Sequence, residues 1–233
     1  MRPEDVKRLY DENYAASYEA KFLTSPITAE DTAFEAHLLR ELLKPGIEWL
    51  DVACGTGYFL RQFPNVRRTG IDLSPDMLAL ARRDNPGVQL FEQNYRLPKP
   101  KWTDRFGLVS CMWYSYTLVD TISEICDVIA NLARWTSRSG TCFVPLADPR
   151  MIARSNLPYD VVDGFAGRTI ITGITWSFIE DNGEKVHAHL VTPQIEFMVE
   201  QFKRFFAKVR IIRYPHKPDG INGRPALIAT DKR

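Results

Sequence analysis

The feature that most constrains the fold is the stretch from residue 47 to residue 57, which reads IEWLDVACGTG. It is an apolar run that ends at Asp51 and passes within six residues into a loop containing Gly55 and Gly57. An apolar run followed by closely spaced glycines is typical of a buried parallel strand whose chain then passes close beneath a ligand. The stretch therefore predicts an α/β fold with a binding site at the carboxyl end of this strand.

The acid indicates which class of ligand this loop suits. A dinucleotide-binding loop offers free amides and a helix N-terminus to a pyrophosphate, and a carboxylate at Asp51 would repel that group. The third glycine of a Gly-x-Gly-x-x-Gly loop would fall at position 60, where this chain has Leu60. A ligand with a cationic end fits the loop better.

A second apolar strand ends in an acid 21 residues after Asp51, at Asp72. Because adjacent strand ends lie roughly 5 Å apart, the Asp72 carboxylate can reach across the crevice and accept two ribose hydroxyls. Ser74 is expected to cap the next helix, with Pro75 in its first turn.

These two strand ends resemble motif I and the acidic strand end of the class I S-adenosylmethionine-dependent methyltransferases. Ala53 replaces the family's first glycine, and Gly55 and Gly57 carry the match. The resemblance implies S-adenosylmethionine, with its ammonium and sulfonium, as the cofactor. The family's third acidic turn is represented here by amides, and either Gln93 or Asn94 can accept from the adenine amine. The residues expected to contact the cofactor are Tyr14, Asp51, Ala53, Gly55, Gly57, Asp72, Leu73, Met77, Gln93, Asn94 and Met112.

Strand-like and helix-like segments alternate through the middle of the chain, which predicts a parallel sheet. We expect strands near 47–53, 67–72, 88–93, 107–113 and 141–146, and helices near 58–63, 75–84 and 121–136. A helix near 194–206 should precede strands near 208–213 and 225–230, which form a hairpin. The resemblance implies a doubly wound, Rossmann-like sheet of seven strands whose last strand runs antiparallel.

At 233 residues and 45% hydrophobic content, the chain can bury its core as one domain, residues 1–233. We expect a helical lid in 1–45, a cofactor-binding core in 46–147, an inserted hairpin on the substrate side in 148–192 and the rest of the core in 193–233.

Tyr10, Tyr14 and Tyr18 are spaced by four, which places them on one face of a helix over residues 3–21. That helix either packs as core or closes over the cofactor, and the resemblance favours the lid. A second helix is expected over residues 28–43.

The insert contains two strand-like segments, 169–179 and 184–192, with Asn182 and Gly183 as a two-residue turn between them. In the register that this turn sets, the facing pairs are Phe178 with His187, Trp176 with His189 and Ile174 with Val191. All six side chains would share one face. That face either walls a substrate pocket or packs on the main sheet.

Methyl transfer is an in-line displacement, so positioning of the acceptor supplies much of the rate. A neutral amine needs only its lone pair exposed, whereas a hydroxyl or carbon acid needs a base, for which Tyr14, His187, His189 and Asp148 are the candidates. Tyr14 and His189 are the predicted catalytic residues, Tyr14 on resemblance to related aminosugar and glycine-type enzymes. The residues expected around the substrate are Tyr18, Trp113, Tyr114, Tyr116, Asp148, Trp176 and His187.

The insert and residues 189–192 are similar to the corresponding region of deoxyaminosugar N-methyltransferases. This similarity favours methylation of an N or O atom on a small molecule, a sugar or natural-product intermediate. Two alternatives stay open: a non-catalytic or partner-dependent methyltransferase-like subunit, and a dinucleotide-dependent oxidoreductase.

Charge and cysteine content narrow the partners. The net charge is +1 with no basic block, so nucleic acid is not expected as a partner, and no apolar stretch approaches the roughly 18 residues of a membrane span. The four cysteines lack CxxC spacing and two neighbouring histidines are too few for a metal site, so we expect reduced thiols, no metal and a cytoplasmic protein. A homodimer remains possible.

Overall fold

A seven-stranded sheet forms the centre of the computed structural model, which describes residues 1–161, 167, 169–180, 183, 185–214 and 223–233. The strand order is β10-β11-β5-β4-β1-β2-β3. The strands are β1 (Glu48–Val52), β2 (Arg67–Asp72), β3 (Gln89–Glu92), β4 (Phe106–Cys111), β5 (Thr136–Pro145), β10 (Phe206–Arg213) and β11 (Pro225–Lys232). β1 to β5 pair in parallel, whereas β11 runs antiparallel to both β5 and β10, so the predicted Rossmann-like sheet with an antiparallel last strand is confirmed.

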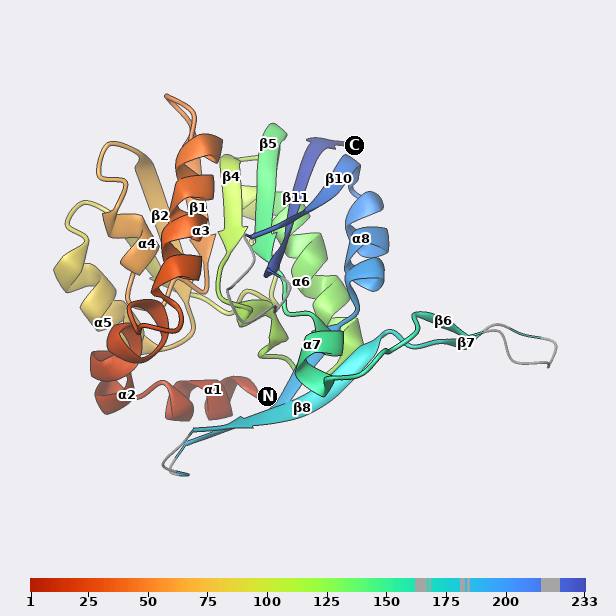
Figure 1. The fold of residues 1–233 in the computed structure, drawn as a ribbon. Coiled ribbons are helices and arrows are strands. Elements are labelled where there is room, and N and C mark those ends of the chain that lie inside the picture. Colours follow the sequence, from red (N-terminus) through yellow and green to blue (C-terminus); the bar gives the residue numbers. More distant parts are fainter. Residues whose placement is uncertain (162–166, 168, 181–182, 184, 215–222) are drawn as a thin grey trace.

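Helices cover both faces of this sheet (Figure 1). Because successive residues of a strand point to opposite faces, Trp49 packs on one side and Leu50 on the other. The Trp49 side is covered by α3 (Ala29–Leu42), α4 (Tyr58–Arg61) and α5 (Pro75–Asp84). The Leu50 side is covered by α6 (Ile122–Trp135) and α8 (Ile195–Lys203). Two continuous apolar layers therefore fix the strand ends in place.

The N-terminal segment is not one helix. It divides into α1 (Pro3–Leu9), α2 (Glu12–Tyr18) and a π-helical turn, Glu19–Leu23, and this segment is called the lid below. The predicted single helix over residues 3–21 was wrong because Asp11 starts a new helix, its side chain accepting a hydrogen bond from the Tyr14 N–H at 2.9 Å. The lid lies across the carboxyl ends of the parallel strands (Figure 1).

The insert contributes α7 (Pro149–Ala153), the short pair β6 (Asp160–Val161) and β7 (Thr169–Ile170), and the hairpin of β8 (Gly173–Ile179) and β9 (Val186–Pro193). Asn182 of the predicted turn lies outside the described residues. Gly183 has a φ of 68°, and its N–H donates to the Glu180 carbonyl at 2.7 Å. The hairpin crosses the same end of the sheet as the lid (Figure 1).

The register of this hairpin differs from the prediction beyond its first pair. Phe178 faces His187 as predicted, but Trp176 pairs with Leu190. Ile174 likewise pairs with Thr192 rather than Val191, so these two predicted pairs were wrong.

A β-bulge is the reason. Ser177 alone stands opposite two residues of β9, Ala188 and His189, and His189 has a left-handed φ of 57°. One extra residue shifts every later pairing, so the six predicted side chains do not share one face.

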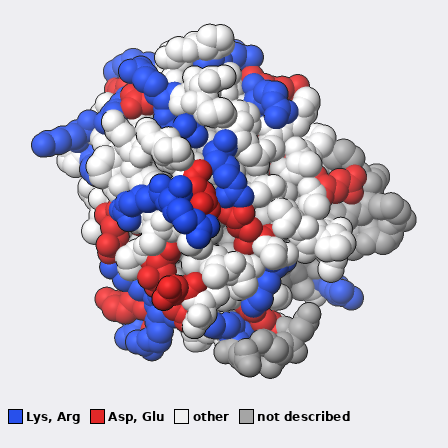
Figure 2. Space-filling model, turned by 90° about the vertical axis from the view of Figure 1, so that its left-hand side faces the viewer, with Lys and Arg blue, Asp and Glu red and all other residues white. Residues whose placement is uncertain are grey.

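Acidic and basic side chains are interspersed over the face that carries α5, without a continuous basic patch in that view (Figure 2). Within the described part of the chain, no helix combines the length and the apolar character needed to cross a membrane. All four cysteines are free, and Cys54, Cys111 and Cys142 are buried.

Close packing of β2 against its neighbours makes Gly70 a test of the fold. A methyl group there would lie 2.8 Å from side-chain atoms of Cys54, Leu60 and Leu90 at once. Gly70→Ala is therefore expected to lower the free energy of unfolding by about 1–3 kcal/mol, measured by urea denaturation. Gly167→Ala is the control, because no atom of the described residues lies within 4 Å of the added methyl group at that exposed position. Equal stability of the two variants would contradict the packing of β2.

Candidate functional site

The candidate site lies where the sheet order reverses, beside the carboxyl ends of β1, β2 and β4. Ligands of open α/β sheets bind in the crevice at such a switch point. The residues that line this strand-end crevice include Ala53 and Gly55 from the loop after β1, Asp72 at the end of β2, Met112 after β4, and Tyr18 from the lid.

Asp51 lies at the base of the crevice and is only 1% exposed. Ser110 donates its hydroxyl proton to the Asp51 carboxylate at 2.6 Å and accepts from the Trp49 indole at 2.8 Å. Burial raises the pKa of Asp51 to about 7, although the bond from Ser110 opposes this. A buried carboxylate of this kind is stabilised by a cation placed beside it.

The loop after β1 turns sharply through three left-handed residues. Ala53 has a φ of 56°, Gly55 of 55° and Gly57 of 74°, so Ala53 adopts a left-handed conformation that glycine adopts more readily. At Gly57 a side chain would also meet the Asn85 amide nitrogen at 2.5 Å, so glycine is required there for space as well as for φ.

Asp72 fastens this loop to the start of α5. Its carboxylate accepts from the Gly55 N–H at 2.8 Å and from the Ser74 N–H at 2.9 Å. Ser74 in turn caps α5, as predicted, by accepting from the Met77 N–H at 3.1 Å. Desolvation raises the pKa of Asp72, while the backbone amides act to lower it. Each carboxylate oxygen keeps a second lone pair with which to accept from a ligand hydroxyl.

The turn after β3, the third predicted strand end, presents a different residue to the crevice from the two amides that were predicted. Gln93 donates its N–H to the Asp72 carbonyl at 2.9 Å, and Asn94 accepts from the Arg96 N–H at 3.0 Å. Tyr95, which the sequence analysis did not select, is the residue of this turn that lines the crevice, together with Leu73 and Met77. The amides of Gln93 and Asn94 remain predictions for the adenine end.

A second cavity of about 260 Å³ adjoins the crevice through Tyr10, Tyr18, Trp113 and Ser115. We call it the aromatic pocket, because its walls are mostly rings. The lining residues are Tyr10, Tyr14, Tyr18, Phe22, Trp113, Tyr114, Ser115, Thr117, Leu118, Trp176, Phe178, His187 and Leu190. The lid, the loop after β4 and the β8–β9 hairpin each supply one wall.

Five of the seven residues predicted around the substrate line this pocket: Tyr18, Trp113, Tyr114, Trp176 and His187. The structure places the other two elsewhere. Tyr116 is 1% exposed in the core, where its hydroxyl accepts from the Ala147 N–H at 3.0 Å. Asp148 caps α7 by accepting from the Arg150 N–H at 3.0 Å.

His187 lines the aromatic pocket and forms a hydrogen bond with Tyr14. Its Nε2 lies 2.9 Å from the Tyr14 hydroxyl and 3.3 Å from Glu180 Oε1, and Lys21 contacts the other oxygen of Glu180 at 2.7 Å. Burial lowers the pKa of His187, against the opposing effect of Glu180, and burial raises the pKa of Tyr14 well above its usual range. The pair is therefore a neutral imidazole beside a protonated phenol at neutral pH.

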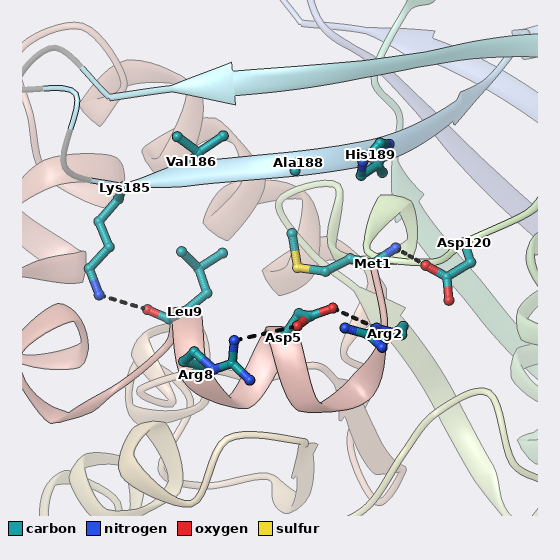
Figure 3. A pocket seen from close by; sticks show the side chains of 10 residues that line it. All are labelled: Met1, Arg2, Asp5, Arg8, Leu9, Asp120, Lys185, Val186, Ala188 and His189. Carbon is teal, nitrogen blue, oxygen red and sulfur yellow. Dashed lines mark hydrogen bonds and ion pairs between the residues drawn. The ribbon is translucent and has the colours of Figure 1, made fainter.

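His189 does not share this position. The bulge places it in a separate hollow of about 760 Å³ between α1 and β9, beside Ala188, Arg2 and Asp5 (Figure 3). Arg2 donates to Asp5 at 3.0 Å inside this hollow. The predicted register put both histidines on one face, whereas in the structure only His187 lies beside Tyr14 in the aromatic pocket.

Residues 50–140 match the family model described as "Methyltransferase domain". The chain is 31% identical over 158 residues to dTDP-3-amino-3,6-dideoxy-alpha-D-glucopyranose N,N-dimethyltransferase of Streptomyces fradiae, a match that covers 66% of this chain and 60% of that relative. It is 27% identical to dTDP-3-amino-3,4,6-trideoxy-alpha-D-glucopyranose N,N-dimethyltransferase of Streptomyces venezuelae, over 91% of this chain and 87% of the relative.

Among solved structures, the fold is similar to that of a S-adenosylmethionine-bound amino pentose methyltransferase from Micromonospora echinaspora. The TM-score is 0.61 at 22% identity, and the match covers 96% of this chain and 98% of the other. This likeness supports the fold.

The environment of His187 predicts a pH effect on stability. Because the pKa of His187 is lowered in the folded protein, the unfolded chain binds a proton at this residue more readily. The free energy of unfolding therefore decreases as the pH falls below about 6.5. His187→Gln should therefore flatten the decline in the free energy of unfolding between pH 7 and pH 5. The exposed His37 on α3 gives the matched control, His37→Gln. An unchanged slope in His187→Gln would contradict the buried, neutral imidazole.

Proposed function

We propose that the chain is a class I S-adenosylmethionine-dependent methyltransferase and that it methylates the amino group of a small deoxyaminosugar, carried as a nucleotide derivative. The observation that carries the proposal is the Tyr14–His187 pair, which faces an aromatic pocket directly beside the strand-end crevice.

The crevice has a donor and acceptor set that fits the cofactor. Asp51 offers a buried carboxylate to an ammonium group, and Asp72 offers free lone pairs to two ribose hydroxyls. Leu73, Met77 and Met112 supply apolar walls. We propose that the amide oxygen of Gln93 or Asn94 accepts from the adenine amine. Bound S-adenosylmethionine would supply an electrophilic methyl group on its sulfonium.

The lid governs access to this crevice. Tyr18 lines both of its narrow parts, which measure about 40 and 30 Å³, and Tyr10 lines one of them. Glu19 fastens the lid to the loop after β1, accepting from the Thr56 hydroxyl at 2.6 Å and pairing with Arg61. We infer that the lid opens to admit the cofactor and closes again over it.

The pocket chemistry favours nitrogen over oxygen. A neutral amine attacks through its own lone pair and needs no strong base, so the His187 imidazole, whose pKa burial lowers, needs only to orient it. The Tyr14 phenol stays protonated and acts by orienting this imidazole and the acceptor. A sugar hydroxyl would instead have to lose its proton to a base during the transfer, and the lowered pKa of His187 makes its imidazole a weak base for this step.

The cellular setting follows from the same proposal. We propose a cytoplasmic enzyme that needs no nucleic-acid or membrane partner, in keeping with its free thiols and mixed surface charge. A homodimer remains a proposal, and so do the residue ranges of the lid, core and insert within one methyltransferase domain.

Labelled methyl transfer tests the proposed function. Purified protein would be incubated with methyl-labelled S-adenosylmethionine and dTDP-3-amino-3,6-dideoxyglucose, with the 3-hydroxy analogue as the matched control. We expect label on the amino sugar and none on its hydroxyl counterpart. Transfer to the hydroxyl, or to neither sugar while other amino sugars are also inert, would contradict N-methylation of this acceptor class.

Asp72→Ala should weaken cofactor binding. Loss of two hydrogen bonds to a charged acceptor costs about 2–3 kcal/mol, which is a roughly 30- to 150-fold rise in the Kd for S-adenosylhomocysteine. Calorimetric titration measures this, and Asp76→Ala on α5 is the control. A Kd within twofold of the wild type would place the ribose elsewhere.

Tyr14→Phe and His187→Asn should slow turnover. Each removes one partner of the hydrogen-bonded pair, and kcat is expected to fall by about tenfold or more in each variant, while the affinity for S-adenosylhomocysteine changes little. Tyr18→Phe keeps the Tyr14–His187 pair and controls for changes in a lid ring. A wild-type kcat in both variants would show that Tyr14 and His187 only pack against each other and have no role in turnover.

A further inference from the structure

The loop after β4 carries an unusual backbone. Trp113 has a φ of 52° and Tyr114 a φ of 59°, so two consecutive residues with large side chains occupy the left-handed region. This region is sterically unfavourable for such residues and persists only where the surroundings hold it. Both rings line the aromatic pocket, so the shape of that wall depends on whatever holds this turn.

Arg224 contacts both rings. It lies just before β11, and its guanidinium carbon is 4.5 Å from the centre of the Trp113 ring and 5.1 Å from that of Tyr114. A planar, weakly hydrated guanidinium suits such stacking better than a lysine ammonium does. Arg224 therefore joins the end of the sheet to the pocket wall.

Two acids of α3 hold Arg224 against these rings. Its Nε lies 3.1 Å from Asp31 Oδ2 and its Nη1 lies 3.9 Å from Glu35 Oε1, and these carboxylate side chains are 5% and 0% exposed. Tyr214, which follows β10, donates its hydroxyl proton to Glu35 at 3.1 Å. Burial raises the pKa of Glu35 to about 7, although Arg224 and Tyr214 act to lower it.

Partners on α3, at the end of β10 and before β11 thus converge on a loop that belongs to none of them. Attachment of α3 alone does not account for this cluster, because the desolvation of buried charges offsets most of the stability that their pairing provides. The cluster does explain how two strained residues keep one conformation beside the pocket.

We propose that Arg224 is a positioning residue, which holds Trp113 and Tyr114 in the conformation that shapes the acceptor wall of the aromatic pocket. This inference rests on the proposed function only where it assigns the acceptor to that pocket. The effect of Arg224 on the loop itself stands on the contacts alone.

Hydrogen exchange tests the effect on the loop without any acceptor. The N–H groups of Ser115 and Thr117 donate to the carbonyls of Met112 and Tyr114, at 3.1 and 2.8 Å, so their exchange rates report the turn. In full-length Arg224→Met with S-adenosylhomocysteine bound, we expect exchange of these amides to quicken by about tenfold. The control is Arg40→Met on another part of α3, where the guanidinium carbon lies 5.8 Å from the centre of the Phe63 ring. This variant should leave the exchange rates of the Ser115 and Thr117 amides unchanged.

Steady-state kinetics with dTDP-3-amino-3,6-dideoxyglucose test the effect on the acceptor. Arg224→Met should raise the acceptor KM by about tenfold and the Kd for S-adenosylhomocysteine by much less, because Trp113 and Tyr114 both line the aromatic pocket and only Trp113 also lines part of the crevice. Arg224→Lys keeps the charge without the planar stack and should fall between the wild type and Arg224→Met. Asp31→Asn loosens the anchor and provides a milder variant if Arg224→Met does not fold.

The outcomes separate the two proposals. Unchanged exchange at Ser115 and Thr117 in a folded Arg224 or Asp31 variant would overturn the positioning role. Faster exchange with an unaltered acceptor KM would overturn its link to the acceptor, and a proportional loss of cofactor affinity would show a purely structural cluster. If the wild type transfers no methyl group to any amino sugar, the proposed function fails, and the exchange rates still decide the role of Arg224 in the loop.

Discussion

The hydrogen bonds of the Asp72 carboxylate are the interaction on which the rest of the site depends. This one side chain joins the Gly55 amide of the loop after β1 to the Ser74 amide at the start of α5. Ser74 then donates its hydroxyl proton to the Tyr10 carbonyl at 2.7 Å, which extends the connection into the lid. The end of β2 therefore determines where the crevice opens and where its cover begins.

The acceptor side depends on contacts between segments that are far apart in the sequence. Lys21 of the lid pairs with Glu180 at the end of β8, and Lys185, just before β9, pairs with Asp11 at 2.8 Å. These ion pairs surround the Tyr14–His187 hydrogen bond, which itself joins the lid to the hairpin. Partly exposed pairs contribute little stability each, so their main effect is to fix geometry. A lid that closes over the cofactor thereby also completes the acceptor pocket.

Much of the fold was predictable because strand ends carry local signals. The acids Asp51 and Asp72 and the glycines beside them predicted a parallel sheet, and in the structure these residues lie at one crevice. The antiparallel last strand followed from the family resemblance and is confirmed by its pairing with β5. The break in the first helix was missed, because the capping role of Asp11 competes with an unbroken spacing of tyrosines.

The acceptor side was less predictable for physical reasons. A single extra residue in β9 moves His189 off the face that the predicted register gave it. The alternation of residues along a strand does not indicate where a bulge will occur. Glu180 and Arg224 act through partners more than a hundred residues away in the chain, such as Lys21 and Asp31, and a single sequence does not show such pairs. Tyr95 lines the crevice because of the conformation of the turn after β3, which the sequence pattern did not predict.

The central claim is that the strand-end crevice binds S-adenosylmethionine beside an acceptor pocket. Calorimetric titration with S-adenosylhomocysteine tests it most directly, with NADH as the control ligand. The expected result is micromolar binding of one S-adenosylhomocysteine per chain and no heat from NADH. Binding of NADH alone, or of neither ligand, would contradict the account.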